Sequence, residues 1–510
     1  MLLSKKNPAF ASGSFDLPEK VLQFGTGVFL RGLIDYYIDK ANRAHLFNGR
    51  VVVVKSTSTG DTRAFGFQDG LYTLLMKSAE DGVPREEAVL VSSISRVLNA
   101  FDEWAAVLAC ASDPQIRIVV SNTTETGIVL DRGERVGAPA GASGLSGFSG
   151  APASATAPAS FPGKLLAYLL ARYLHFNGSP ESGLVIVPTE LIPGNGDLLK
   201  KIVYELAIIN GLDPAFIRWM DEACAFCNSL VDRIVPGRLP QDEHAAAEKA
   251  LGYEDDLMIM SETYGLWAIE TASGRTKEIL SFYKADPGIH LVPDIYTFRE
   301  LKLRLLNGSH NLSCALGFLS GFGTVKEAMA DKDFGQYMSR LILEEIAPAI
   351  VDEHISASAA EAFGKEVLER YRNPYISFDW LDICVQDTAK LRIRAVPIVL
   401  KHFAKFGFVP DGIALGFAAY ILFMKSERNA AGEYSGTLNG KRYRIQDDFA
   451  EVLWGKWEGA APSLPASAGS LVTGVLSDLR LWGADLSALE GFTNAVTIQL
   501  CGLIEKSFKN

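Results

Sequence analysis

A short apolar segment followed at once by a Gly-x-Gly turn is the sequence feature that most restricts the fold. Residues 20–24 are typical of a buried strand, Gly25-Thr26-Gly27 follows, and an apolar helical pattern starts at Val28. Strand, glycine turn and helix in this order bring a pyrophosphate onto the N-terminus of the helix. Gly25 would make the tight turn, and Gly27 would let the backbone approach the phosphate. A structural turn without a ligand is the alternative, because Leu30 stands where the usual third glycine is expected.

Runs that are apolar at every position predict further strands of one sheet. Residues 50–55 contain four successive valines, and similar runs lie at 116–120 and 183–187. Such strands are typical of a parallel sheet that is covered by helices on both faces. Helical patterns separate them, so we predict a Rossmann-like α/β domain with a mostly parallel sheet. Another strand is predicted at 88–94.

The second half of the chain has a different pattern. From Pro293 onward the periodicity is helical almost throughout, which predicts an all-helical C-terminal domain. We therefore expect a dinucleotide-binding domain at 1–288 and a helical domain at 289–510. Residues 136–160 are rich in Gly, Ala, Ser and Pro and nearly uncharged, which predicts a flexible insertion inside the first domain.

The cofactor candidates surround the first turn and the ends of two later strands. Lys55 stands where dinucleotide-binding proteins usually carry an acidic residue for the ribose diol of NAD. This lysine, with neighbouring hydroxyls, could instead accept the 2′-phosphate of NADP, although Asp61 or a backbone group could still bind the diol. Arg31 could reach a phosphate or cap a surface. The predicted cofactor-binding residues are Phe24, Gly25, Thr26, Gly27, Val28, Phe29, Arg31, Lys55 and Asn122.

A second candidate site lies on one helix, at residues 302–310. At ~100° per residue, Lys302 lies at ~0°, His310 near ~80° and Asn307 near ~140°, so the three share less than half of the helix circumference. A lysine in a desolvated pocket has a lowered pKa and can take a proton from an alcohol near neutral pH. Asn307 and His310 could then hold the substrate oxygen. The alternative is an ordinary amphipathic helix with a solvated lysine.

Composition excludes several classes of partner. The chain has 510 residues, a net charge of -11 and 21% charged residues, which argues against nucleic acid or an anionic membrane as a partner. The start of the chain turns polar too early for a secretory leader. Six scattered cysteines predict reduced thiols in the cytoplasm. Cys224 and Cys227 have no second pair for zinc, so we predict two buried thiols on successive helical turns and no metal.

Taken together, the motifs resemble a known family. Residues 228–236 resemble the signature of the mannitol dehydrogenase family, the polyol-specific long-chain dehydrogenases. Lys302, Asn307 and His310 match the Lys-x4-Asn-x2-His spacing of that family. Stretches such as 68–73 and 372–376 are most similar to its uronate-reducing branch, and the resemblance spans about residues 18–505 apart from the insertion.

The resemblance implies a metal-independent hydride transfer with NAD, in a cleft between a Rossmann-like and a helical domain. The implied reaction interconverts D-altronate and D-tagaturonate. Lys302 would be the general base, and Asn307 and His310 would bind the reacting oxygen. Asp232 and Arg370 match residues on the substrate side. Lys390, in a basic stripe that ends at Arg394, is a further candidate for binding a sugar acid.

One departure from the family pattern affects substrate binding. Polyol members carry an asparagine after the strand that ends near Thr189, whereas this chain has Leu191. Asn195 could replace the missing donor. Reduction of fructuronate, or oxidation of a polyol by a polyol dehydrogenase, is the alternative activity. A nucleotide-sensing protein without turnover is the alternative from another functional class.

Overall fold

The computed structural model describes residues 1–6, 13–57, 60–80, 83–123, 127–136, 156–459 and 465–507. The chain forms two compact units. The first unit consists of Met1–Lys77 and Arg85–Ile295, and the second unit consists of Ser78–Pro84 and Tyr296–Asn510. Of the predicted insertion at 136–160, residues 137–155 lie outside the described residues. No helix within these described ranges is long and apolar enough to cross a membrane.

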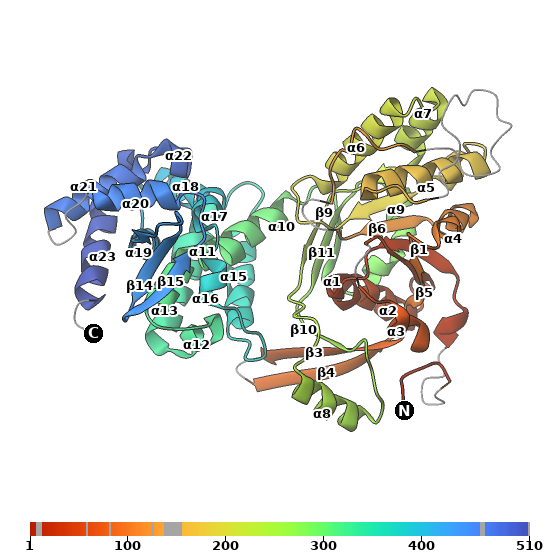
Figure 1. The fold of residues 1–510 in the computed structure, drawn as a ribbon, viewed down its shortest axis with the longest axis horizontal. Helices are drawn as coiled ribbons and strands as arrows, with labels where there is room; N and C mark the ends of the chain where they lie inside the picture. Colours follow the sequence, from red (N-terminus) through yellow and green to blue (C-terminus); the bar gives the residue numbers. More distant parts are fainter. Residues whose placement is uncertain are drawn as a thin grey trace. The chain divides into compact units, whose positions relative to one another are not determined.

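A six-stranded parallel sheet forms the centre of the first unit (Figure 1). Its spatial order follows the third, second, first, fourth, fifth and sixth of its strands along the chain, which is the order of doubly wound dinucleotide-binding folds. This confirms the predicted Rossmann-like domain. In spatial order the strands are β5 (Ile94–Asn99), β2 (Arg50–Lys55), β1 (Glu19–Phe24), β6 (Ile118–Ser121), β7 (Val185–Pro188) and β8 (Ala225–Phe226).

Each face of this sheet has its own apolar layer, because successive side chains of a strand point to opposite faces. Leu22 and Phe24 pack with helices α5 (Phe161–His175), α6 (Asn195–Ile209) and α7 (Pro214–Ala223). Val21 and the odd-numbered valines of β2 pack on the other side, against a continuous helical segment over residues 28–43. That segment consists of α1 (Val28–Leu30), a π-helical turn (Arg31–Asp35) and α2 (Tyr36–Arg43). Figure 1 shows α5 and α6 on one side of the sheet and α1 and α2 on the other.

The strand predicted at 88–94 has the wrong bounds, because it combines parts of two strands. The chain instead forms β4 (Val83–Val91), beside β3 (Tyr72–Glu80), and then starts β5 at Ile94. The break falls at Ser92, whose backbone N–H donates to the carboxylate of Asp39 at 2.7 Å and therefore leaves the strand. The third parallel strand of the central sheet is thus β5, which was not predicted.

Smaller elements complete the first unit. β11 (Leu266–Glu270) pairs antiparallel with β9 (Ser229–Asp232) and parallel with β12 (Ile289–Val292), and β10 (Ile259–Ser261) pairs with β3. Cys224 and Cys227 flank β8, so the prediction that they lie on one helix is wrong. Both thiols are buried, and burial raises their pKa values to about 11 and about 12. The short helices are α3 (Arg63–Phe67), α4 (Trp104–Ala109), α8 (Gln241–Leu251) and α9 (Gly274–Ile279).

The second unit is rich in helices, as predicted. Its core gathers around Phe417 of α19 (Asp411–Phe423), whose ring contacts those of Trp482 and Phe492 at centroid distances of 5.3 and 5.6 Å. Its other helices are α10 (Tyr296–Leu301), α11 (Ser309–Leu319), α12 (Val325–Ala330), α13 (Lys332–Arg340), α14 (Ala347–Ile350), α15 (Ala357–Tyr371), α16 (Trp380–Ile383), α17 (Asp387–Arg394), α18 (Val396–Phe406), α20 (Ala450–Glu458), α21 (Pro465–Leu476), α22 (Leu479–Trp482) and α23 (Phe492–Ser507).

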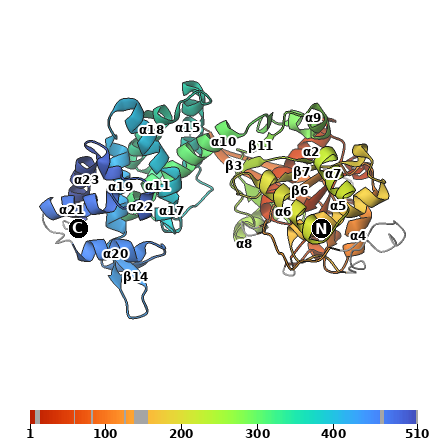
Figure 2. The same cartoon turned by 90° about the horizontal axis from the view of Figure 1, so that it is seen from above.

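One small sheet departs from the all-helical prediction. β13 (Glu427–Arg428), β14 (Tyr434–Leu438) and β15 (Lys441–Ile445) form an antiparallel sheet, whose β14–β15 hairpin lies at the edge of the second unit (Figure 2). The hairpin turns at Asn439 and Gly440, both with positive φ (50° and 74°). Asn-Gly is the favoured pair for such a two-residue turn, so the signal was present in the sequence.

Candidate active site

The Gly-x-Gly turn lies at the carboxyl end of β1, where the strand order of the sheet reverses. Gly25 has φ 128°, and a Cβ atom there would lie 2.9 Å from Leu30 Cδ1 and 3.1 Å from the carbonyl oxygen of Asn122. Glycine is therefore required at this position by the turn itself. Gly25 N–H donates to the carbonyl oxygen of Val54 at 3.0 Å, which ties the turn to the neighbouring strand.

Gly27 is different, because neither backbone nor packing requires a glycine there. Its φ is -63°, it is exposed, and an added Cβ atom would meet nothing within 4 Å. It precedes the helical segment 28–43, and no side chain caps the start of this segment. Uncapped N–H groups at a helix N-terminus bind phosphate. The residues of this turn therefore fit the pyrophosphate of a dinucleotide.

Gly32 supplies what the missing third glycine would supply. A Cβ atom on Gly32 would lie 2.8 Å from the methyl groups of Val235. The helix can pack closely against this neighbour only because Gly32 has no side chain, which is the packing role of the third glycine in the usual fingerprint.

The ends of the three central strands are joined beside this turn. The backbone N–H of Asn122 donates to the carbonyl oxygen of Phe24 at 3.2 Å, and its side-chain amide donates to the carbonyl and hydroxyl oxygens of Thr189 at 3.1 and 3.0 Å. Glu190 is buried and accepts hydrogen bonds from the backbone and hydroxyl of Thr123 at 2.8 and 2.9 Å. Asn122 thus has a structural use, and its predicted contact with the cofactor stays a prediction.

The two candidates for the ribose differ in their surroundings. Lys55 ends β2, is buried, and its carbonyl oxygen accepts a hydrogen bond from Ala100 N–H at 3.0 Å. Asp61 is exposed, and its carboxylate accepts side-chain hydrogen bonds from Arg63 at 2.7 to 3.1 Å. These bonds lower the pKa of Asp61 to about 2. Lys55 is thus the last, buried residue of a central strand, whereas Asp61 lies in the exposed segment after it.

Arg31 is buried rather than displayed at the turn. Its guanidinium donates to the carbonyl oxygen of Leu257 at 2.6 Å and lies over the rings of Phe65 and Tyr72, 5.5 and 5.4 Å from their centroids. The hydroxyl of Tyr72 donates back to the carbonyl oxygen of Arg31 at 2.7 Å. These contacts favour a structural role for Arg31 over the predicted contact with phosphate.

Arg233, which follows Asp232 in the chain, is bound by backbone carbonyl groups. Arg233 is buried, donates to the carbonyl oxygens of Glu262 and Gly32 at 2.8 and 2.7 Å, and lies 4.9 Å from the ring centroid of Tyr36. Carbonyl acceptors therefore satisfy this buried charge. Asp232, the predicted substrate-side residue, is buried on β9 opposite Leu266.

Lys302, Asn307 and His310 come from one helix, as predicted, but its geometry is not that of an α-helix. Residues Lys302–Gly308 form a π-helical turn between α10 and α11. A π turn bonds each residue to the fifth residue along, so the angles expected for 3.6 residues per turn do not apply, and such turns are frequent at functional sites. Lys302 is buried, and Asn307 and His310 are half-buried.

His310 is held in an aromatic setting. Its ring stacks on that of Tyr371, with centroids 4.2 Å apart and planes at 23°. The hydroxyl of Tyr371 donates to the carbonyl oxygen of Leu306 at 2.7 Å, on the π turn. The neighbouring Arg370 is buried at the same end of α15 and is thereby brought beside the helix of Lys302. Tyr371 was not predicted, although it lies in the polar segment after Arg370.

The remaining basic candidates have local partners. The ammonium group of Lys390 donates to the carbonyl oxygen of Ile383 at 3.1 Å. Arg394 donates to the side-chain oxygen of Asn311 at 2.8 Å. Both groups lie on α17 of the second unit.

Asn195 cannot take over from the missing donor at Leu191. It is fully buried, its amide donates at 3.0 Å to the carbonyl oxygens of Pro188, Glu190 and Ser229, and its oxygen accepts from two backbone N–H groups. Leu191 is 60% exposed. The suggestion that Asn195 contacts the substrate is therefore wrong.

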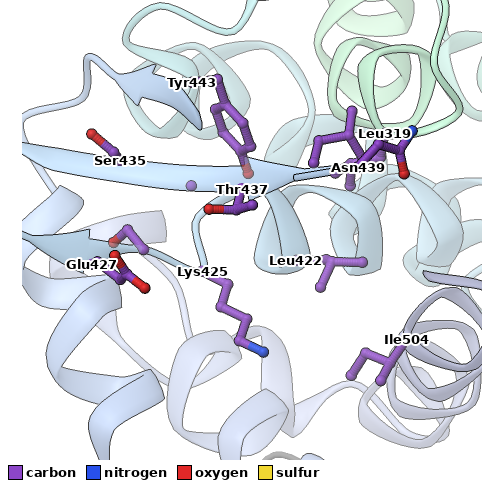
Figure 3. Close-up of a pocket in the computed structure, with 12 residues that line it drawn as sticks. Leu319, Leu422, Lys425, Glu427, Ser435, Thr437, Asn439, Tyr443 and Ile504 are labelled. Atoms are coloured by element: carbon purple, nitrogen blue, oxygen red, sulfur yellow. The ribbon is translucent and has the colours of Figure 1, made fainter. Parts of the chain in front are cut away.

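In the part of the chain that the structure describes, neither a metal site nor the cavity at the end of α11 coincides with the candidate site residues. Among the described residues, no group of three or more His, Cys, Asp or Glu side chains could hold a metal ion. A cavity of about 350 Å³ lies at the Leu319 end of α11, whereas His310 lies at the other end. Lys425, Leu422 and Ile504 face one another around it (Figure 3), and its lining contains none of the predicted site residues.

Comparison of the sequence with known proteins identifies the family to which both halves of the chain are similar. The family model of the mannitol dehydrogenase Rossmann domain matches residues 19–280, and that of the mannitol dehydrogenase C-terminal domain matches residues 294–501. Altronate oxidoreductase of Bacillus subtilis (strain 168) is 34% identical over 488 residues, covering 95% of this chain and 92% of the relative. Altronate oxidoreductase of Klebsiella pneumoniae (strain 342) is 34% identical over 97% of this chain and 96% of the relative.

Two solved structures share the fold over the full chain. Mannitol 2-dehydrogenase of Pseudomonas fluorescens, solved with NAD and D-mannitol, has a TM-score of 0.65 at 22% identity, covering 100% of this chain and 98% of that one. A D-sorbitol dehydrogenase in substrate-free form has a TM-score of 0.72 at 20% identity, covering 100% and 99%. Both halves of the chain are thus matched by models of one family, and the chain belongs to the mannitol dehydrogenase family.

Proposed function

We propose that the chain is an NAD-dependent altronate oxidoreductase, which interconverts D-altronate and D-tagaturonate. The observation that carries the reaction type is a buried lysine, Lys302, on a π turn that also presents Asn307, with His310 just beyond it. The choice of substrate is supported by relatives named altronate oxidoreductase that match nearly the whole chain.

NAD, when bound, would supply the hydride-transfer chemistry at the carbinol carbon of the substrate. The glycine turn at Gly25 and Gly27 would hold the pyrophosphate through backbone N–H groups. Lys302 would take the proton of the secondary alcohol and would return it during reduction. Asn307 and His310 would hold the reacting oxygen by hydrogen bonds, which keeps that oxygen within reach of the amine.

A sugar acid also needs a cation for its carboxylate. Arg370 is buried beside the Lys302 helix, and Lys390 and Arg394 lie on α17 of the same unit. The paired donors of a guanidinium fit a carboxylate in a bidentate manner, which makes Arg370 the strongest candidate anchor. Asp232 would contact a substrate hydroxyl as an acceptor.

Parallel assays of NADH oxidation with tagaturonate, fructuronate and fructose test the proposal. We expect the highest kcat/KM with tagaturonate and the lowest with uncharged fructose. Equal efficiency on fructose and tagaturonate would contradict a carboxylate anchor, and a preference for fructuronate would assign the isomeric reaction.

The role of Lys302 is tested by Lys302→Ala. General acid–base catalysis contributes roughly 10²–10⁴-fold, so kcat should fall by about that factor while NADH binding stays intact. Lys425→Ala is the matched control, because this lysine lies at the cavity beyond the far end of α11. Turnover of Lys302→Ala near that of the control at every pH from about 6 to 10 would refute the assignment.

A further inference from the structure

We infer that α17 acts as a clamp that aligns the catalytic helix, with Arg304, Asn311 and Asp387 as positioning residues for the reaction. The clamp consists of these three residues and Arg394. This inference rests on the proposed function, because it assumes that Lys302, Asn307 and His310 carry the chemistry. The three positioning residues, Arg304, Asn311 and Asp387, are assigned no contact with substrate or cofactor.

The first arm of the clamp holds the π turn. Arg304 lies on this turn two residues after Lys302, is buried, and donates to the carbonyl oxygens of Ile393 and Arg394 at 2.6 and 3.0 Å. These are the last residues of α17, whose end carbonyls lack partners within the helix. Glu300 fixes the guanidinium by bonds of 3.0 and 3.2 Å. The segment with Lys302 and Asn307 is therefore tied to one end of α17.

The second arm holds α11 immediately after His310. Asn311 is fully buried, its amide donates to Asp387 Oδ1 at 2.6 Å, and its oxygen accepts from Arg394 at 2.8 Å. Asp387 and Arg394 are the first and last residues of α17. The two arms together fix the segments before and after His310 against the same short helix. Loss of one arm would thus let the lysine, the amide and the imidazole move relative to one another.

The bond between Asn311 and Asp387 also depends on charge. Asp387 is fully buried, and burial raises its pKa to about 7, although hydrogen bonds from Asn311 and Cys314 lower it. The charged or titratable groups that face it are Cys314, Cys384, Lys390, Tyr420 and Asp447. Hydrogen bonds to an ionised acceptor are stronger than those to a neutral one. The second arm should therefore tighten as pH rises through about 7.

The variants Asn311→Ala and Asp387→Asn test the clamp. Misplacement by about 1 Å costs roughly 10²-fold in rate, so we expect Asn311→Ala to lower kcat by about 10- to 100-fold. The KM for NADH should change less than about twofold, because the first unit holds the glycine turn. Asp387→Asn keeps the shape of the acceptor and removes its titration. We expect it to reduce the rise of kcat between about pH 6 and 8, where Asp387 titrates in the wild type.

Thr388→Val is the matched control. Thr388 follows Asp387 on the same helix, is fully buried, and shares a hydrogen bond of 2.5 Å with Tyr420 of α19 rather than with the catalytic helix. Its loss should destabilise the fold to a similar degree and leave kcat near the wild-type value. If Asn311→Ala does not fold, Arg304→Lys tests the other arm in the same way, because a lysine cannot reproduce the forked contacts.

The rates are compared on whichever of tagaturonate, fructuronate or fructose the wild type reduces fastest, so an error in the proposed substrate does not affect the test. Equal kcat for Asn311→Ala and Thr388→Val, with an unchanged pH profile in Asp387→Asn, would overturn the clamp while the proposed function stands. A wild type that reduces none of the three ketoses would overturn both.

Discussion

Asp35 should make the first unit less stable as pH rises through the neutral range. This carboxyl group lies on the π turn that follows the glycine turn and is fully buried. Gln23 donates a hydrogen bond to it at 3.2 Å, but burial is the larger effect and raises its pKa from 3.8 to about 7. Arg31 lowers this pKa, and the hydroxyl of Tyr72 is a further titratable group near the carboxyl.

The sign and size of the effect follow from linkage between folding and proton binding. Between about pH 4 and 7 the unfolded chain releases the proton of Asp35 while the folded protein keeps it, so the free energy of unfolding falls as pH rises. The shift of about three pKa units corresponds to about 4 kcal/mol as an upper bound, at 1.36 kcal/mol per unit. Below about pH 4 the carboxyl group is neutral in both the folded and the unfolded state, so its titration does not lower the free energy of unfolding there.

Asp35→Asn removes the titration and keeps an oxygen for the Gln23 hydrogen bond. Urea unfolding of wild type and variant at pH 5, 6, 7 and 8 should show a stability difference that grows by up to about 1.4 kcal/mol per pH unit until about pH 7 and then levels off. Asp61→Asn is the control, since its exposed carboxylate has a pKa of about 2 and titrates below this range. A difference between Asp35→Asn and wild type that is constant from pH 5 to 8 would refute the reasoning.

Three further outcomes are expected. Gly27→Val should leave the melting temperature nearly unchanged, because nothing lies within 4 Å of the added Cβ. It should weaken NADH binding, which is measured by fluorescence titration. Unchanged NADH binding would mean that no phosphate of the cofactor lies at Gly27. Lys55→Asp should raise the ratio of kcat/KM for NADH to kcat/KM for NADPH by about tenfold, which corresponds to ~1.4 kcal/mol. The change should come chiefly from weaker NADPH binding. A wild-type ratio that favours NADPH would instead establish an NADP-dependent enzyme. Turnover should survive prolonged dialysis against a chelator, and loss of activity that zinc restores would show that a metal takes part.

The sequence predicts an element correctly where the element is buried on both faces, because every position is then apolar. The four valines of β2 predicted a parallel sheet, because such a strand has no solvent-facing side to carry polar residues. β5 was not predicted because Ser95 and Arg96 interrupt its apolar run. The hairpin at Asn439 and Gly440 was not predicted for another reason. Helical periodicity dominates the surrounding sequence and obscures the strong turn signal of this pair.

The candidate site shows where sequence patterns end. The one-helix placement of Lys302, Asn307 and His310 followed from spacing alone, but the π turn between them did not, because a helical period of 3.6 was assumed. The sequence alone allows Arg31 to bind a phosphate, because it does not show which group accepts the guanidinium hydrogen bond. That partner, the carbonyl of Leu257, lies 226 residues away along the chain. Contacts of this range depend on the tertiary fold and leave no local pattern.

The π turn makes chain length, rather than side-chain identity, a determinant of catalytic geometry. A π turn arises when a helix accommodates one extra residue, and its removal would restore α-helical bonding. Deleting one residue among 303–306 would then rotate His310 by roughly 100° about the helix axis relative to Lys302. Conservative replacement of the leucines in this stretch leaves the count unchanged. Homologues or engineered variants of this protein can therefore be expected to vary in the apolar residues of the turn while preserving the number of residues from Lys302 to His310.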